Sequence, residues 1–263
     1  MLDRRWRYFL AHFFWAKLPR DVQFFISRWH AAFYKKTWSR FLIRPYSALQ
    51  YRSRLDLARF VPASGSPTYL SFQDFFTRRL ASVPQPIREY VWPCDGMLCD
   101  LSRIGDDETV LIKGERRAVR TIFGSMGADL PVDYFFTNVF LHNRDYHRIH
   151  APVSGRVVTI EKIPGELRFL RPWAYLDGPS IPALTNERIG VRLDGDDGKR
   201  TWLSIIGGPG VATIELAPGV AVGSYVRVGA ELAAFHLGST CCLVSERRPT
   251  ARLGEHVRVG ERL

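Results

Sequence analysis

The chain has 263 residues, 46% of them hydrophobic, which suffices for one large domain or one domain with an appendage. No zinc-finger, RNP or basic-zipper pattern accompanies its net charge of +11, so we expect no nucleic-acid partner. The four cysteines form two close pairs, Cys94/Cys99 and Cys241/Cys242, without zinc-ligand spacing. We therefore expect no metal site, and reduced, mostly buried thiols in a cytosolic compartment.

Residues 1–60 carry nearly all of the excess positive charge. They hold thirteen Lys and Arg against three Asp, a net +10 that leaves +1 for the rest of the chain, together with sixteen of the 34 aromatic residues. Large apolar residues recur there at helical spacing: Val22, Phe25, Ile26, Trp29 and Phe33. Such a stripe suits a helix in a lipid interface and equally a helix packed on a core. The concentration of charge favours the membrane, so we expect residues 1–60 to form a helical membrane-association segment.

The longest apolar run near the N-terminus, Tyr8–Ala16, is far shorter than the roughly 20 residues that a spanning helix needs. It lacks a small-residue cleavage site, so it is not typical of a signal peptide. We predict a peripheral protein on the cytoplasmic face of the cell membrane. A further helix is predicted over Ser71–Leu80, with Ser71 as its N-cap and Asp74 in its first turn.

From about Val91 onward, short alternating strands separated by Gly and Pro turns predict a β-rich body. An internal repeat lies within it, since Gly223–Leu232 and Gly254–Leu263 share six of ten residues. With "APVSG" upstream, these units resemble the barrel-sandwich halves of biotinyl and lipoyl carrier domains, at the level of fold alone. We predict an α+β protein with a β-rich, barrel-sandwich-like catalytic body over residues 61–263.

Three stretches contain residues suited to chemistry. "PCDGML" places Asp95 in a P-x-D-G turn, which alone is an ordinary turn. "NRDYHRIHAPVSG" carries His147 and His150, which fit a metal site, an acid/base pair or two buried core imidazoles. "LGST" places Ser239 after Gly238 without the G-x-S-x-G of hydrolases, and alone it is typical of a hairpin turn.

Taken together, in this order and spacing, the three stretches resemble the phosphatidylserine decarboxylases. Four shorter matches support the resemblance: "FTRRL" (76–80), "KGE" (113–115), "PGEL" (164–167) and "TNERIGV" (185–191). The sequence departs from the family at Gly208, where an alanine is usual in a loop continuing as Pro209-Gly210, and at Cys241-Cys242, where an aliphatic pair is usual. The first departure bears on headgroup specificity, and the second is conservative strand packing.

The resemblance implies a proenzyme that cuts itself between Gly238 and Ser239, giving a β chain (1–238) and an α chain (239–263). Ser239 would become a covalent pyruvoyl group, the only cofactor expected. His150 and Asp95 match the family's partners for Ser239 in this self-cleavage. His147 matches the histidine near the substrate, and we expect it to protonate the carbanion. The product would be phosphatidylethanolamine, formed from phosphatidylserine through a Schiff base.

The expected partners are phosphatidylserine, an anionic membrane surface, and the α and β chains of one heterodimer, with or without further oligomerisation. Two other functions fit parts of the sequence. One is a non-catalytic lipid-binding barrel-sandwich module, which the repeat alone would satisfy. The other is a serine hydrolase that uses Ser239, His150 and Asp95, although the usual hydrolase elbow is missing.

Overall fold

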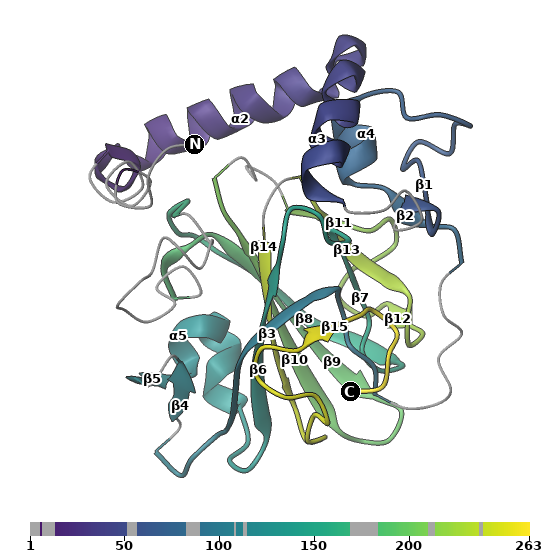
Figure 1. Cartoon of the computed structure of the whole chain (residues 1–263). Coiled ribbons are helices and arrows are strands. Elements are labelled where there is room, and N and C mark those ends of the chain that lie inside the picture. The colour runs from purple at the N-terminus through teal and green to yellow at the C-terminus, as the bar shows by residue number, and fades with distance from the viewer. Residues whose placement is uncertain are drawn as a thin grey trace.

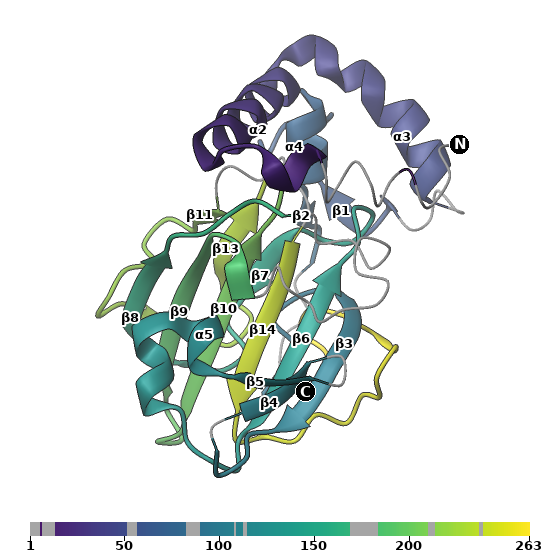
Figure 2. The same ribbon diagram turned by 90° about the vertical axis from the view of Figure 1, so that its left-hand side faces the viewer.

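A computed structural model describes residues 6, 14–51, 57–82, 90–107, 109–112, 115–168, 184–209, 214–236 and 239–263. Its centre is an eight-stranded antiparallel sheet with the order β12-β8-β9-β10-β14-β6-β3-β15 (Figures 1 and 2). In chain order its strands are β3 (Gly96–Arg103), β6 (Phe135–Leu141), β8 (Gly155–Ile163), β9 (Arg188–Gly195), β10 (Arg200–Gly207), β12 (Tyr225–Val226), β14 (Ser239–Ser245) and β15 (His256–Val257).

The α+β class is confirmed, but the large sheet is open rather than closed into a barrel. Its outermost strands, β12 and β15, are two residues long and each pairs with a single neighbour, β8 and β3 respectively. The predicted barrel-sandwich-like body is thus confirmed only as a large antiparallel sheet, and that sheet is not closed. The predicted β-rich texture is confirmed, since strands occupy the described parts of all the segments where alternation was seen after Val91.

Separate layers cover the two faces of the sheet. A three-stranded sheet of β11 (Ile214–Leu216), β13 (Glu231–Phe235) and β7 (Arg148–His150) shares a core with Cys241 and Leu243. On the opposite face, α5 (Arg120–Phe123) packs with Cys242 and Val244. The 3-10 helix η5 (Gly124–Asp129) and the hairpin β4 (Thr109–Ile112)–β5 (Glu115–Ala118) flank α5. Successive β14 side chains thus enter two different cores, as the period of two in a strand requires.

The two copies of the repeat form the two opposite edges of the large sheet. β12 belongs to the first copy and β15 to the second, at equivalent positions. Gly223 N–H donates to Val157 O at 2.8 Å in the first copy, and Gly254 N–H donates to Leu98 O at 2.8 Å in the second. The repeated sequence therefore folds twice into the same edge.

The turns that precede β3 and β8 are also equivalent. "WPCDG" (92–96) precedes β3, and "APVSG" (151–155) precedes β8. The two turns are bonded reciprocally, because His150 N–H donates to Pro93 O at 2.8 Å and Val91 N–H donates to Pro152 O at 2.9 Å. The glycine of each turn is needed for space, since a Cβ would lie 2.6 Å from Phe140 O at Gly96 and 2.2 Å from Asp194 O at Gly155. The body thus has an approximate internal twofold symmetry.

The N-terminal helices lie together at one end of the large sheet (Figures 1 and 2). They are η2 (Trp15–Lys17), α2 (Arg20–Lys35), η3 (Thr37–Leu42) and α3 (Ile43–Gln50). Helices thus occupy most of the described residues between 14 and 51, as predicted, whereas the division into two domains stays a prediction. In the described part of the chain, no helix combines the length and hydropathy required to cross a membrane.

Helix α2 buries Phe24 but exposes most of its predicted apolar stripe. Its buried residues are Gln23, Phe24, Ser27 and Ala31, whereas Phe25 is 71% exposed and Trp29 is 64% exposed. Gln23 fastens the helix, because its amide donates to Trp15 O at 3.1 Å and accepts from Leu167 N–H at 3.1 Å. The apolar stripe of the sequence is therefore not a core-facing stripe.

The helix expected over Ser71–Leu80 is shorter in the structure. Helix α4 (Phe72–Phe76) begins as predicted, with Ser71 Oγ accepting from Asp74 N–H at 3.1 Å, but ends four residues early. Residues Arg79–Leu80 form β2, which pairs with β1 (Phe60–Val61). Just after α4, the buried guanidinium of Arg78 donates to the carbonyl groups of Arg144 and Asp145, which ties the chain to the body where the helix has ended.

Candidate active site

Asp95 is buried in the turn before β3 and is 3% exposed. Its Oδ1 accepts from Val259 N–H at 2.9 Å, and its Oδ2 lies 3.4 Å from Arg59 Nη2. Burial raises the pKa of the Asp95 carboxyl, and the opposite charge of Arg59 and the Val259 amide counteract that rise. Asp95 therefore combines a turn-closing hydrogen bond with a buried negative charge.

His150 ends β7 and uses both of its ring nitrogens. Nδ1 lies 2.7 Å from Gly229 O, and because a carbonyl only accepts, Nδ1 carries the proton. Nε2 then accepts from the Tyr146 hydroxyl at 2.9 Å. Burial lowers the pKa of His150, which favours the neutral ring with a basic Nε2.

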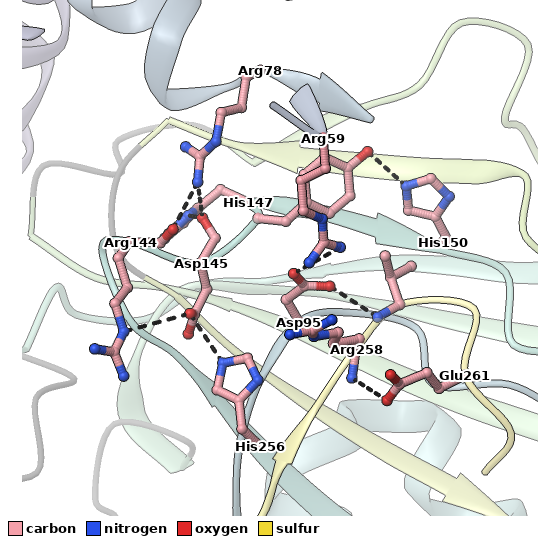
Figure 3. A network of polar contacts seen from close by, with 12 residues as sticks. Arg59, Arg78, Asp95, Arg144, Asp145, His147, His150, His256, Arg258 and Glu261 are labelled. Carbon is pink, nitrogen blue, oxygen red and sulfur yellow. Dashed lines mark hydrogen bonds and ion pairs between the residues drawn. The ribbon is translucent and has the colours of Figure 1, made fainter. Parts of the chain in front are cut away.

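The structure brings Asp95 and His150 close through the backbone, but among the described residues their side chains share no hydrogen bond. Figure 3 shows them on separate contacts, with Asp95 joined to Arg59 and His150 held elsewhere. Tyr146 interacts with both, because its hydroxyl donates to His150 Nε2 and its pKa responds to the charge of Asp95. Its pKa is raised by burial and then by the nearby carboxylates of Glu231 and Asp95. The roles assigned to Asp95 and His150 stay predictions.

His147 lies immediately before β7 and is completely buried. Its Nδ1 donates to Asp145 O at 2.9 Å, and the ring packs against Phe76 with centroids 4.2 Å apart. Its Nε2 has no hydrogen-bond partner among the described residues. Burial lowers the pKa of His147 to about 4. His147 is thus a neutral imidazole with an unused lone pair, as a proton-transfer residue requires.

A second carboxyl–imidazole pair, Asp145 with His256, lies in the same region (Figure 3). Asp145 Oδ1 lies 3.0 Å from His256 Nε2, and its Oδ2 accepts from His142 N–H at 2.7 Å. Burial acts to raise the pKa of the Asp145 carboxyl. The hydrogen bond and positive charge of His256, together with the His142 amide, outweigh burial and lower this pKa below its usual value. The same bond raises the pKa of His256.

Ser239 is the first residue of β14, between Gly207 of β10 and Leu141 of β6. Leu237 and Gly238 lie outside the described residues, so the predicted cleavage site is described only from its C-terminal side. The preceding strand β13 ends beside His147, where Phe235 N–H donates to His147 O at 2.9 Å. Four residues reach at most about 14 Å, so Ser239 lies within that distance of Phe235.

Asn186 fixes the residue opposite Ser239. It is completely buried, and its Nδ2 donates to Gly207 O at 2.7 Å and to Arg168 O at 2.8 Å. Gly208 and Pro209 follow directly, while residues 210–213 of that loop are outside the description. The "NER" match of the sequence thus gains a physical role, because it holds the strand that neighbours the predicted scission site.

Sequence reasoning missed three residues of this site: Tyr146, Arg59 and Asn186. Tyr146 stood inside the quoted histidine stretch, and a buried tyrosine beside a histidine is a hydrogen-bonding candidate that could have been named. Asn186 was noted only within a supporting match. Arg59 carried no sequence signal, because its approach to Asp95 depends on the pairing of β1 with β2.

Comparison with known proteins places these residues in a family. The phosphatidylserine decarboxylase family model matches residues 72–263. A phosphatidylserine decarboxylase proenzyme of Acinetobacter baumannii (strain ATCC 17978) is 32% identical over 195 residues, 68% of this chain and 68% of that protein. One of Halorhodospira halophila is 28% identical over 242 residues, 82% of this chain and 78% of that protein.

Other relatives match over a shorter stretch. The proenzyme of Methylobacillus flagellatus is 31% identical over 139 residues, 50% of this chain and 48% of that protein. The chain thus spans about half the length of some of the curated relatives that it matches. The family model nevertheless covers the three chemical stretches and most of the chain. This chain belongs to the phosphatidylserine decarboxylase family.

Proposed function

We propose that this protein is a self-processing phosphatidylserine decarboxylase that converts phosphatidylserine to phosphatidylethanolamine. One observation carries the proposal, namely that backbone hydrogen bonds join the elements of all three chemical stretches. His150 N–H donates to Pro93 O at 2.8 Å, and Phe235 N–H donates to His147 O at 2.9 Å, four residues before Ser239. These bonds bring the Asp95 turn and the two histidines together although they are far apart in sequence, and they support a position for Ser239 within about 14 Å of the Phe235 that bonds to His147.

Self-cleavage would begin when the Ser239 hydroxyl attacks the carbonyl carbon of Gly238. His150 Nε2 is the base that we assign, and it must first exchange its hydrogen bond from Tyr146 for one from the serine. The Gly238–Ser239 C–N bond then breaks, which frees the amine of residue 239 and leaves Gly238 attached to its side chain as an ester. The ester loses the α-proton of residue 239, and its Cβ–O bond breaks to release Gly238 as a carboxylate. Addition of water to the dehydroalanine and loss of ammonia leave the ketone of a pyruvoyl group.

The described residues fit a pyruvoyl group at position 239, because His147, whose buried Nε2 has no partner among the described residues, is bonded through its backbone to Phe235, four residues before that position. When present, the group supplies Schiff-base chemistry, an electrophile for the headgroup amine and a sink for the electrons released with CO₂. His147 Nε2 can take a proton from the serine ammonium and return it to carbon after CO₂ leaves.

The α and β chains would stay together after cleavage. Strand β14 of the α chain lies between β10 and β6, both of which belong to the β chain. Strand β15 of the α chain pairs with β3 on the edge. Cutting one peptide bond before β14 leaves these ladders intact, which supports a heterodimer of the two products.

The exposed face of α2 supports a lipid surface as the partner. Phe25 and Trp29 project from the helix, and the neighbouring η3 adds Phe41, which is also 71% exposed. Exposed Arg and Lys residues border this face. Because aromatic residues beside cations favour an anionic lipid interface, we infer peripheral binding at the cytoplasmic face of the cell membrane.

The processing proposal is tested by the mass of the purified protein. We expect a fragment of residues 239–263 with a blocked, ketone-bearing N-terminus, and CO₂ release from phosphatidylserine vesicles. Ser239→Ala should stay uncut, while Ser245→Ala, at the other end of β14, should be cut. An intact chain with a free Ser239 that binds vesicles without releasing CO₂ would instead identify a lipid-binding module. An intact chain whose Ser239 reacts with a fluorophosphonate would identify a hydrolase.

The lipid proposal is tested by vesicle sedimentation. Phe25→Ser and Trp29→Ser should each weaken binding to phosphatidylserine vesicles by about tenfold, because each removes a large apolar side chain from the interface. Leu253→Ser is the matched control, since Leu253 is 60% exposed in the loop before β15. Raised salt should also weaken binding. Equal effects of the three substitutions would contradict the assignment of this face.

A further inference from the structure

The "FTRRL" stretch (76–80) has no role in the chemistry described so far, yet nearly all of it contacts the histidine segment. The Phe76 ring packs on His147, and Thr77 O accepts from Arg148 Nε at 2.8 Å. Leu80 packs in a small core with Tyr146. Arg79 alone is exposed. The stretch therefore forms one wall of the site.

Arg78 is the centre of this wall and is completely buried. Its Nη2 donates to Arg144 O at 2.7 Å, to Asp145 O at 2.8 Å and to the Tyr51 hydroxyl at 2.8 Å. The guanidinium also lies over the Phe60 ring, 4.3 Å from its centroid. Burying a guanidinium without a carboxylate partner is costly. Two of its anchors are the carbonyl groups of Arg144 and Asp145, three and two residues before His147, which points to a role beyond packing.

The Asp145 carbonyl connects Arg78 to His147, as Figure 3 shows. It accepts from Arg78 Nη2 at 2.8 Å and from His147 Nδ1 at 2.9 Å. A carbonyl fixed from one side by a guanidinium presents a rigid acceptor to the imidazole. Because that acceptor cannot donate, the neutral ring must carry its proton on Nδ1. Nε2 is then left as the free base.

The charged groups that face His147 come from the turn after α4 and from the loop after β6. The Arg78 cation and His142 favour the neutral ring, and Asp145 opposes them. Burial is the largest influence, and together these bring the pKa of His147 to about 4. His147 thus holds no proton on Nε2 near neutral pH.

We propose that Arg78 is a positioning residue that holds the Asp145 carbonyl and thereby fixes His147 as the Nδ1–H tautomer. The catalytic consequence rests on the proposed function, in which Nε2 of His147 moves the proton. Without the guanidinium, the Arg144 and Asp145 carbonyls lose their anchor. The imidazole can then turn or adopt the Nε2–H tautomer, which has no lone pair on that atom.

The test compares Arg78→Met and Arg78→Lys with the exposed neighbour Arg79→Met as the matched control. The tautomer of His147 is read from ¹⁵N chemical shifts in the uncut Ser239→Ala chain, so this measurement does not depend on processing or activity. Decarboxylation is measured on processed protein as kcat and KM against pH. The cooperative melting of each variant reports its folding.

We expect Arg78→Met to lower kcat on the order of 100-fold with little change in KM, since a small displacement of a reacting group has an effect of that size. Its His147 should lose the pure Nδ1–H signature, and its acid limb should move to higher pH because a cation is gone. Arg78→Lys keeps the cation, so kcat should fall while the acid limb stays in place. Arg79→Met should match the unaltered chain in every measurement.

A folded Arg78→Met chain with an unchanged His147 tautomer and acid limb would overturn the proposal. An equal loss of kcat in Arg79→Met would also overturn it, because the effect would then not be specific to Arg78. If neither Arg78 variant melts cooperatively, Arg78 serves stability alone and the proposal fails. If the unaltered chain releases no CO₂ from phosphatidylserine, the proposed function fails. The tautomer measurement would still decide whether Arg78 positions His147.

Discussion

The turn before β8, with His150, belongs with the first copy of the repeat, and the turn before β3, with Val91, belongs with the second, because each turn bonds to that copy. In the first copy extended in this way, Ser154 Oγ accepts a hydrogen bond from Val228 N–H at 2.8 Å. In the second copy, Asp95 Oδ1 accepts from Val259 N–H at 2.9 Å, at the equivalent position of the same turn. Either side chain closes the turn, so folding requires only an acceptor there. The carboxylate adds a buried charge, which Arg59 partly balances at 3.4 Å.

The same contrast recurs at two other pairs of equivalent positions. His150 stands where the second copy has Val91, and each donates its backbone N–H to the proline of the opposite turn. His256 stands where the first copy has Tyr225, which donates to Asp196 Oδ2 at 2.5 Å on the surface. Ionisable groups thus occupy places that a neutral residue fills in the other copy. Exchanging residues between the copies can therefore separate folding from chemistry.

The largest expected effect is that of Asp95→Ser, which copies the first repeat into the second. The serine can still accept from Val259 N–H, so the chain should fold, but it lacks the carboxylate of the proposed Ser239–His150–Asp95 set. We expect self-cleavage to slow on the order of 10³-fold or more, measured as the uncut fraction over time by mass spectrometry.

The control for that exchange is Ser154→Ala in the first copy. It removes one turn hydrogen bond, which should lower the free energy of unfolding by about 1 kcal/mol and leave cleavage unchanged. Normal cleavage of Asp95→Ser would show that Asp95 serves the turn alone, as Ser154 does. The contrast between the copies would then be structural and not chemical.

Alternation and turn residues predicted most of the fold. Strands such as β8 and β9 follow from period-two patterns, and the repeat marks two equivalent edges. The sequence did not predict that the sheet stays open. Whether its outer strands β12 and β15 meet and close it depends on the twist and order of all the strands between them. The end of α4 was also missed, since Arg78 forms a long-range bond to carbonyl groups that no local pattern reveals.

The candidate site was predicted through its motifs rather than its contacts. Asp95, His147, His150 and Ser239 were selected because their stretches co-occur. Their hydrogen-bond partners could not be selected in this way, because Val259 and Gly229 contribute backbone atoms, which carry no side-chain signal. The outward face of α2 was one of two open alternatives, because an amphipathic pattern does not say which face meets the body.

The second exchange, His150→Val, copies the second repeat into the first. It leaves Gly229 O and the Tyr146 hydroxyl without their partner, so in the uncut Ser239→Ala chain the free energy of unfolding should fall by about 1–3 kcal/mol at pH 7.5. The measurement is urea unfolding at several pH values.

The pH dependence of this loss has a definite sign. Burial lowers the pKa of His150 below its ordinary 6.5, so the unfolded chain binds the proton first, and stability falls as the pH drops below 6.5. His150→Val lacks this group, so its deficit should shrink toward pH 5. Val91→Ala, the control, should show a deficit that does not vary with pH. A deficit in His150→Val that grows toward acid pH would mean that His150 is charged in the folded state.

The smallest expected effect concerns His256, which is bonded to Asp145, compared with the equivalent Tyr225. Asp145 raises the pKa of His256, so the charged pair contributes stability fully below pH 6.5 and loses it as the pH rises through that raised pKa. Because 41% of the His256 side chain is exposed, solvent limits the contribution to about 1 kcal/mol or less.

His256→Gln keeps a donor for Asp145 and removes the charge, so its deficit in the free energy of urea unfolding should be present at pH 5.5 and absent at pH 9. Tyr225→Phe should show equal deficits at both values, since the pKa of Tyr225 lies above 10. An equal deficit of His256→Gln at both values would show that this position supplies a hydrogen bond alone, which would remove the charge difference between the two copies here.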